Sequence, residues 1–314
     1  MRHRLPWAWR GLAAAAVALY VAGMTAGCGG APGEAPPASQ RPKVIATTSI
    51  VGDVVSQVAG EDVAVRVLLP GETDPTGYSP SAADATAAAA ADAIFAAGAG
   101  FEPFLAKLAA TAKPGAVVEL ASDLPLRRRG DGGIDPFVWL DPDLVGRWVD
   151  TIEGVLAKAD PGRAATYHDH AQRYRLELAA LDAMIEDIAT SLPDDRRRLV
   201  GDMAAFGYFA AGYGLEDGGA VLGATSSPRA AGDLPVTEMA AAIAAADVPS
   251  VLIATPANRD RALELANRSG VSLAPVWVLG LSEPGGPADS YLGLMRRLGI
   301  AVGQGWGEKQ TPTP

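Results

Sequence analysis

From Lys43 onward the sequence alternates short apolar runs with segments of helical periodicity, and this alternation restricts the fold more than any other feature. The first run is Val44-Ile45-Ala46-Thr47, and an amphipathic stretch follows from Ile50 to Ala59. Strands that alternate with helices predict an α/β fold with parallel sheets covered on both faces. Further strands are expected at 63–69, 94–96, 117–119, 199–201, 220–222, 251–253 and 271–276, and further helices at 81–91, 104–108, 144–157, 206–213, 236–246, 259–268 and 291–298.

One predicted helix is much longer than the others. It begins near Arg163, after Pro161, and runs to about Ser191 with apolar residues at mostly helical spacing. At about 1.5 Å per residue it spans roughly 40 Å, the length of a whole domain. We therefore expect two βα lobes, at 43–160 and 193–302, joined by a linking helix at 161–192. Residues 303–314 are predicted to form a tail.

The composition excludes several classes of protein. The chain has 314 residues, of which 49% are hydrophobic and 20% charged, which suffices for two lobes with separate cores. A net charge of −10 and the lack of a large Lys/Arg face argue against a nucleic-acid partner. The single cysteine rules out an internal disulfide and a zinc site of the Cys-x-x-Cys kind.

The amino terminus has the pattern of a secretory signal. Three arginines precede an apolar segment at 11–23 that is too short to span a bilayer comfortably. Thr25-Ala26-Gly27-Cys28 resembles a bacterial lipobox, although Thr25 stands where an aliphatic residue is usual; Cys28 is then the residue that is acylated. The alternative is an ordinary cleaved signal with an incidental cysteine. The Gly/Pro/Ala/Ser-rich run at 29–42 favours a lipoprotein tethered to the outer face of the cytoplasmic membrane.

Several motifs follow one another along the chain. They are VIATTS at 44–49 with Val58-Ala59-Gly60, DPTGYSP at 74–80, DPFVWLDP at 135–142, AFGYF at 205–209 and SYLGLM at 290–295. No single motif is decisive, but the ordered set is specific, covers nearly all of the mature chain and resembles the zinc- and manganese-binding solute receptors of ABC importers. The resemblance implies a two-lobed receptor that binds its ligand in a cleft between the lobes and delivers it to an ABC permease in the membrane.

The resemblance also assigns the metal ligands, and this chain has replaced all four. Histidine is expected after Asp-Pro, where the chain has Thr76, and again at Phe137. The third ligand falls at Met203 by ungapped counting, and the final acid falls at Trp277. A hydroxyl, a thioether and two hydrocarbon surfaces are poor substitutes for imidazole and carboxylate donors. Zinc or manganese is expected from the family, but its ligands are absent, so we predict no cofactor.

Other residues offer few replacements for the lost ligands. His168 and His170 lie two positions apart on the long helix, point to different sides of it and are expected on its surface. An oxygen-rich metal site involving Asp202 stays open as an alternative. Asp135 and Asp141 belong to the loop frame and fit turn and capping roles better.

The substitutions point instead to an apolar, aromatic cleft. One hypothesis is that it encloses an organic molecule or a metal chelate. The alternative is a non-transporting pseudo-receptor or partner-binding module at the cell envelope, with the cleft filled by its own side chains. The sequence has no nucleophile elbow, phosphate loop or histidine beside a nucleophile, so we do not expect an enzyme. Beyond the four ligand positions, the cleft candidates are Tyr78, Asp202 and Thr255, with Phe206 and Tyr208 nearby.

Overall fold

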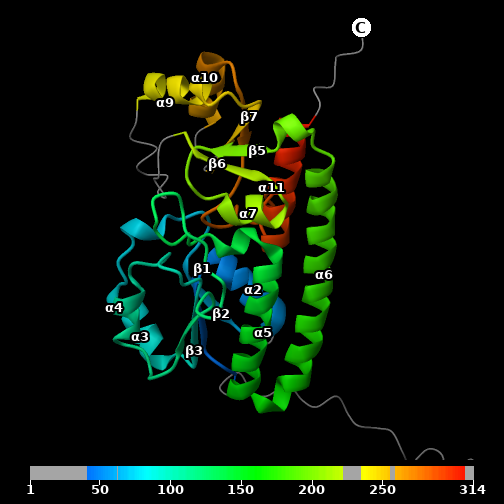
Figure 1. Ribbon diagram of the computed structural model, residues 1–314. Helices are drawn as coiled ribbons and strands as arrows, with labels where there is room; N and C mark the ends of the chain where they lie inside the picture. Colours follow the sequence, from blue (N-terminus) through cyan, green and yellow to red (C-terminus); the bar gives the residue numbers. More distant parts are fainter. Residues whose placement is uncertain (1–40, 62, 222–234, 255–258, 308–314) are drawn as a thin grey trace, which may run out of the picture. The chain divides into compact units, whose positions relative to one another are not determined.

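Two four-stranded parallel sheets form the centres of two lobes (Figure 1). The structure is a computed structural model that describes residues 41–61, 63–221, 235–254 and 259–307. The α/β fold with two parallel sheets is confirmed. The first sheet has the order β2-β1-β3-β4, with β1 (Val44–Thr48), β2 (Val65–Leu69), β3 (Ala93–Ala96) and β4 (Val117–Glu119). The second has the order β6-β5-β7-β8, with β5 (Arg198–Gly201), β6 (Glu216–Ala220), β7 (Ser250–Ile253) and β8 (Ser272–Pro275).

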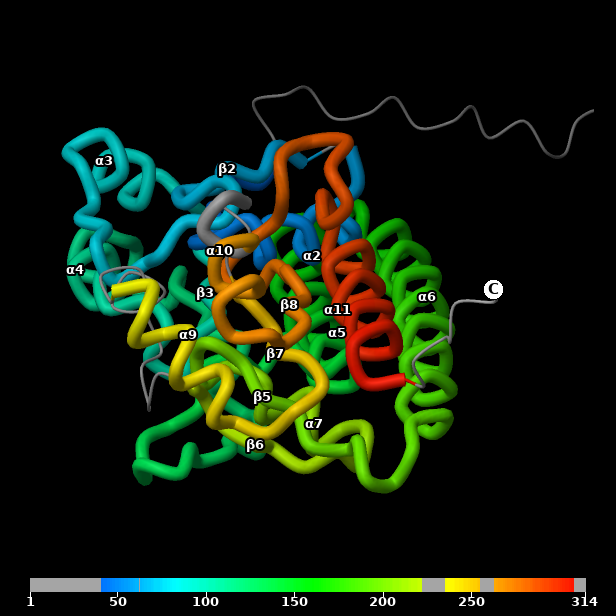
Figure 2. The backbone as a smooth tube through the Cα atoms, turned by 90° about the horizontal axis from the view of Figure 1, so that it is seen from above, coloured from blue at the N-terminus to red at the C-terminus, as the bar shows by residue number. Residues whose placement is uncertain are grey.

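Helices cover both faces of the first sheet because successive strand residues point to opposite faces. Ile45 and Ile94 pack in one apolar cluster with α3 (Ala82–Ala90) and α4 (Leu105–Ala109). Ala46 and Phe95 point the other way, toward α2 (Ser49–Ala59) and α5 (Pro142–Ala159). Figures 1 and 2 show α3 and α4 on one side of this sheet and α2 and α5 on the other. Ser81 caps the start of α3 with a capping box.

The second sheet is layered in the same way. Val200 and Val251 pack against α9 (Val236–Ala245) and α10 (Arg259–Ser269), whereas Leu252 joins the cluster that holds α7 (Gly207–Gly212) and α11 (Tyr291–Trp306). That cluster also contains the inner face of the first sheet. One apolar cluster is therefore continuous from one lobe to the other.

The long helix α6 (Ala164–Thr190) has the predicted position and nearly the predicted bounds. It packs along α2 and α5 of the first lobe and along α11, which ends beside the second sheet (Figure 1). Its contact with α11 is close: a Cβ added at Gly299 would lie 3.0 Å from Cγ1 of Ile185. In the described ranges, no helix combines the length with the apolar character needed to cross a bilayer.

Two predicted elements were placed wrongly. The strand expected at 220–222 is β6, which occupies Glu216–Ala220 and includes two acids and two glycines. It is an edge strand paired only with β5 among the described strands, so its formation does not require an apolar pattern. The last helix does not end at Leu298 but continues to Trp306, whose buried indole donates a hydrogen bond to the Arg198 carbonyl at 2.8 Å. The predicted tail therefore begins too early.

Tyr291 ties α11 to the first lobe. Its side chain is fully buried, and its hydroxyl donates a hydrogen bond to the backbone carbonyl of Trp139 at 2.8 Å. The backbone N–H of Tyr291 donates to Asp53 on α2 at 2.9 Å. The start of the last helix is thus held at two points, on the loop at 135–142 and on α2.

Replacing Tyr291 with phenylalanine is expected to lower the free energy of unfolding by about 1–2 kcal/mol, because the buried Trp139 carbonyl loses its donor. Tyr174→Phe is the matched control, since Tyr174 is equally buried but its hydroxyl has no hydrogen-bond partner within the described part of the chain. That change should be neutral. Urea denaturation of both variants measures the difference, and equal losses would contradict this role of Tyr291.

Candidate functional site

The loop at 135–142 is built by two aspartates that bond its backbone. Asp135 Oδ1 accepts a hydrogen bond from the Phe137 N–H at 3.0 Å, and the chain then makes a 3-10 turn at Val138–Leu140. Asp141 caps α5 by accepting from the N–H groups of Asp143 and Leu144. The turn and capping roles predicted for Asp135 and Asp141 are confirmed. These bonds fix the direction in which Phe137 points.

Phe137 stands at one of the positions where the resemblance expects histidine, and it is fully buried. Its ring meets Phe101 edge-on at 5.9 Å and Trp139 at 5.4 Å, and Phe101 and Trp139 are 4.6 Å apart between ring centres. Edge-to-face contacts of this kind add stabilisation beyond apolar burial. The space near this position is therefore occupied by three packed aromatic rings.

The two lobes are hydrogen-bonded to each other beside this aromatic group. Trp139 Nε1 donates to the Val278 carbonyl at 3.0 Å, and the Val278 N–H donates to Glu72 Oε1 at 3.2 Å. The Leu281 N–H donates to Ser49 Oγ at 2.9 Å. Between them, a Cβ at Gly280 would lie 1.9 Å from the backbone oxygen of residue 71, so only glycine allows this backbone contact.

Met203, another position that the resemblance assigns to a metal ligand, is also fully buried and belongs to the same apolar cluster as Phe137. The preceding residue, Asp202, lies just beyond β5 and is 5% exposed. Its Oδ1 accepts a hydrogen bond at 2.9 Å from the N–H of Ala254, just beyond β7. Burial raises the pKa of Asp202 to about 6. This carboxyl joins the carboxyl ends of two neighbouring strands, β5 and β7.

Glu102 has the same place in the first lobe. It accepts hydrogen bonds from Thr47 Oγ1 at the end of β1 and from the N–H groups of Ala97 and Gly98 beyond β3. Burial raises its pKa. In open α/β sheets, ligands bind at the carboxyl ends of strands where the strand order reverses. Each lobe of this protein has a buried, internally bonded acid at that point.

Glu102 and Glu72 were not among the residues predicted from the sequence. Burial raises the pKa of Glu72 to about 8, while hydrogen bonds from Val278 and Leu279 lower it and the charge of Asp202 raises it further. Glu72 therefore holds a proton at neutral pH. The available signal for Glu102 was a lone acid inside the apolar run 101–105, whereas no local pattern marks Glu72.

Glu72 and Asp202 bring one carboxyl from each lobe into electrostatic contact. Across the described ranges, however, no group of three or more His, Cys, Asp or Glu side chains is arranged to hold a metal ion. The pair is the strongest oxygen-donor candidate between the lobes, and Asp202 was one of the predicted candidates.

The other predicted cleft residues lie in different surroundings. Trp277 is partly buried against the shared apolar cluster. Thr76 is exposed and donates its hydroxyl to Asp74 Oδ1 at 2.7 Å, within the 3-10 turn Pro75–Gly77. Tyr78 packs on Phe104 at 4.8 Å, in the cluster on the outer face of the first sheet. Tyr78 therefore packs in a different apolar cluster from Phe137 and Met203, and its place in the cleft stays a prediction.

The other residues singled out from the sequence are two aromatic residues, two histidines, Thr255 and Cys28. Phe206 and Tyr208 are buried in the shared apolar cluster, and the Tyr208 hydroxyl accepts from the Arg127 N–H at 2.8 Å. His168 is exposed as expected, whereas His170 is half-buried beside Val58. Thr255 and Cys28 lie outside the described residues.

Two βα lobes, one long helix between them and candidate positions at the carboxyl ends of both sheets define the class: this is a solute-binding protein of an ABC importer. Residues 44–301 match the family described as zinc-uptake complex component A, periplasmic, and the chain belongs to this family. The resemblance stated from the motifs is confirmed.

Individual relatives agree with this assignment. The chain is 28% identical over 284 residues to the manganese-binding lipoprotein MntA of Halalkalibacterium halodurans, which covers 89% of this chain and 93% of the relative. It is 31% identical over 220 residues to the zinc-binding protein TroA of Treponema pallidum, covering 69% and 71% of the two chains. The TroA structure superposes with a TM-score of 0.73 at 25% identity, covering 85% of this chain and all of TroA (100%). The manganese-bound periplasmic protein of Candidatus Liberibacter asiaticus shares the fold, with a TM-score of 0.68 at 22% identity over 83% and 98% of the two chains.

The raised pKa of Glu72 predicts a pH-dependent stability. Between pH 4.5 and about 8 the folded protein keeps a proton on Glu72 that the unfolded chain has released, so stability falls as the pH rises. Glu72→Gln cannot ionise and keeps an acceptor for the Val278 N–H. The variant should match the wild-type melting temperature near pH 5 and exceed it near pH 8.

Melting curves across this pH range test the prediction. The control is Glu186→Gln, the same substitution at an exposed position of α6. Parallel pH profiles for wild type and Glu72→Gln would show that Glu72 does not carry the effect.

Proposed function

We propose that this protein is a membrane-anchored, extracytoplasmic solute-binding protein of an ABC importer that has lost the ordinary zinc or manganese site of its family. One observation carries the proposal. Phe137 and Met203, at two of the four ligand positions, are both fully buried in the apolar cluster that runs from one lobe to the other. We infer that these side chains fill the space that the motif resemblance assigns to the metal.

The chemistry of the four positions supports this proposal. A zinc site needs donors that are deprotonated, correctly spaced and already oriented. Phenyl and indole carbons provide none, and one thioether without a second soft ligand is a poor copper site. The Thr76 hydroxyl is bonded to Asp74. A bare zinc or manganese ion has no set of donors here.

The cleft is therefore proposed to be filled. Phe137 contacts the Phe101 and Trp139 rings, and the bonds of Trp139 and Glu72 to Val278 hold the lobes together beside it. An organic molecule or a metal chelate would have to displace these contacts before it could bind. We accordingly place the filled cleft ahead of such cargo, and we assign the protein no catalytic role.

Anchoring follows from the sequence and the relatives. MntA of Halalkalibacterium halodurans is described as a lipoprotein, and the lipobox-like segment ends at Cys28. We propose that Cys28 is acylated and that residues 29–42 tether the lobes to the membrane surface. The membrane permease of the importer is then the partner within reach, even when the cleft holds no metal.

A second candidate has one observation in its favour. Glu72 and Asp202 contribute a carboxyl from each lobe, and a bound cation would favour release of the proton that burial and the charge of Asp202 keep on Glu72. Two carboxyls with backbone oxygens and water suit a hard, weakly held cation better than zinc. This candidate predicts metal binding that depends on both acids.

Calorimetric titration of zinc and of manganese into the chelator-stripped chain tests the proposal. We expect no submicromolar one-to-one binding and no metal-dependent rise in melting temperature, because a ligand stabilises a fold only when it binds the folded form. Asp202→Asn and Glu72→Gln serve as companion variants. Tight, stoichiometric binding that either variant abolishes would contradict the filled cleft and identify the carboxyl pair as the site.

A further inference from the structure

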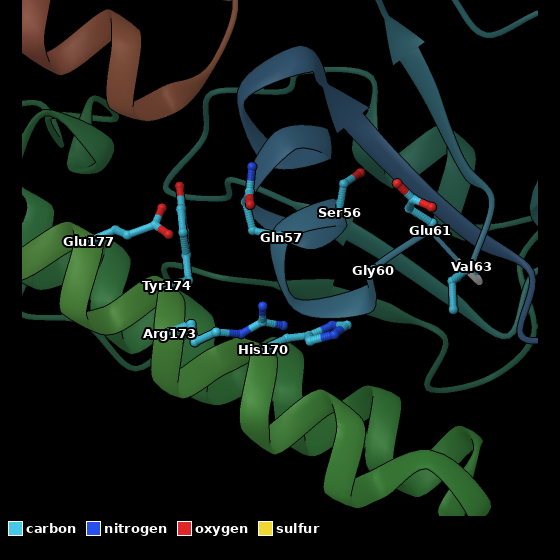
Figure 3. A pocket seen from close by; sticks show the side chains of 9 residues that line it. All are labelled: Ser56, Gln57, Gly60, Glu61, Val63, His170, Arg173, Tyr174 and Glu177. Carbon is cyan, nitrogen blue, oxygen red and sulfur yellow. The ribbon is translucent and has the colours of Figure 1, made fainter. Parts of the chain in front are cut away.

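A polar groove lies between α2 and α6 on the first lobe, and it shares no residue with the site between the lobes. Its volume is about 620 Å³, and it is lined by the exposed side of α2, by the turn after α2 and by one stretch of α6. Figure 3 shows the side chains of α6 facing those of α2 across this space. Pockets of 300–1,000 Å³, roughly, are the size that binds small organic molecules.

His170 and Gly60 shape the groove at one end. Gly60 ends α2 with a φ of 71°, and a Cβ there would lie 2.5 Å from Cε1 of His170. His170 Nδ1 lies 3.2 Å from the Val58 carbonyl, which can only accept, so Nδ1 is the donor. In the neutral ring Nε2 is then left as an acceptor.

Two opposite charges of α6 line the groove without a partner of their own. Arg173 and Glu177 are exposed and four residues apart, so they share one face of the helix. Within the described ranges, neither side chain has a hydrogen bond or an ion pair. By contrast, Arg175 on the same helix is paired with both Asp150 and Glu153.

Tyr174 gives a second observation, separate from the charges of Arg173 and Glu177, that points to a ligand. It lines the groove between Arg173 and Glu177, its side chain is 2% exposed, and its hydroxyl has no hydrogen-bond partner in the described part of the chain. Figure 3 shows the hydroxyl end of Tyr174 directed toward the α2 side, near Gln57 and Glu177. Buried polar groups in folded proteins almost always have hydrogen-bond partners, so we expect this hydroxyl to have one as well.

We propose that this groove binds a small zwitterion, an amino acid or a short peptide. Its carboxylate pairs with the Arg173 guanidinium, and its ammonium pairs with Glu177. The Tyr174 hydroxyl and the Gln57 amide bond its remaining polar atoms. The Glu61 carboxylate also lines the groove. A ligand with only a negative charge would be repelled by the two glutamates, and one with only a positive charge would be repelled by Arg173, whereas a zwitterion pairs with both signs of charge. The assignment goes beyond the receptor function proposed for the space between the lobes and does not depend on it.

The test screens the purified chain against the proteinogenic L-amino acids and a set of dipeptides. A thermal-shift screen comes first, and calorimetry follows for each compound that raises the melting temperature. We expect one-to-one binding of at least one compound. Arg173→Gln and Glu177→Gln should each weaken its affinity about tenfold or more, because each removes a charge-assisted hydrogen bond.

Two further variants sharpen the test. Arg147→Gln removes the same charge from an exposed position on α5 and should leave the affinity unchanged. Tyr174→Phe should weaken binding without lowering the stability of the free protein. Absence of binding by every compound, or equal binding by wild type, Arg173→Gln and Glu177→Gln, would overturn the proposal. Neither result bears on zinc binding between the lobes, so the two proposals fail separately.

Discussion

The structure depends on Trp139, which fixes the first lobe to the second. Its indole is fully buried, donates to the Val278 carbonyl and packs edge-on against Phe101 and Phe137. Its own carbonyl accepts from Tyr291 at the start of α11. One residue of the loop at 135–142 thus holds both the last loop of the second lobe and the last helix. Because these ring contacts and hydrogen bonds all lie within the chain, they do not need a metal to form.

This arrangement is compatible with the proposed loss of the family's metal site. A buried histidine or glutamate between the lobes would cost free energy unless a metal ion or a hydrogen bond satisfied it. Phenylalanine and methionine instead contribute about 1.5–3 kcal/mol each by burial. Under that proposal, Phe137 and Met203 provide contact between the lobes that does not depend on a metal. The remaining polar groups, Asp202 and Glu102, are bonded to the backbone at the ends of the strands.

Much of the fold was predictable from the sequence, because apolar strands and long amphipathic helices produce local periodicity. The edge strand β6 was misplaced, since an edge strand needs no apolar run. The end of α11 was missed because its glycines suggested a tail, although they allow α11 to approach Ile185 and Ile188 of α6.

The candidate site was less predictable than the fold. Motif order indicated the positions that the resemblance assigns to metal ligands. The direction of a side chain depends on tertiary contacts, so the motifs did not predict that Tyr78 packs on Phe104. Glu72 was missed because its partners lie more than 200 positions away, at Val278 and Leu279, and no local pattern reports them.

The central claim is that apolar side chains occupy the place of the metal between the lobes. Crystals of the protein soaked in zinc and in manganese, with diffraction data collected at each metal's absorption edge, test it most directly. The account predicts no anomalous density among Phe137, Met203 and Trp277. An anomalous peak at ligand distance from Asp202 or Glu72, with Phe137 displaced from its contacts with Phe101 and Trp139, would contradict it.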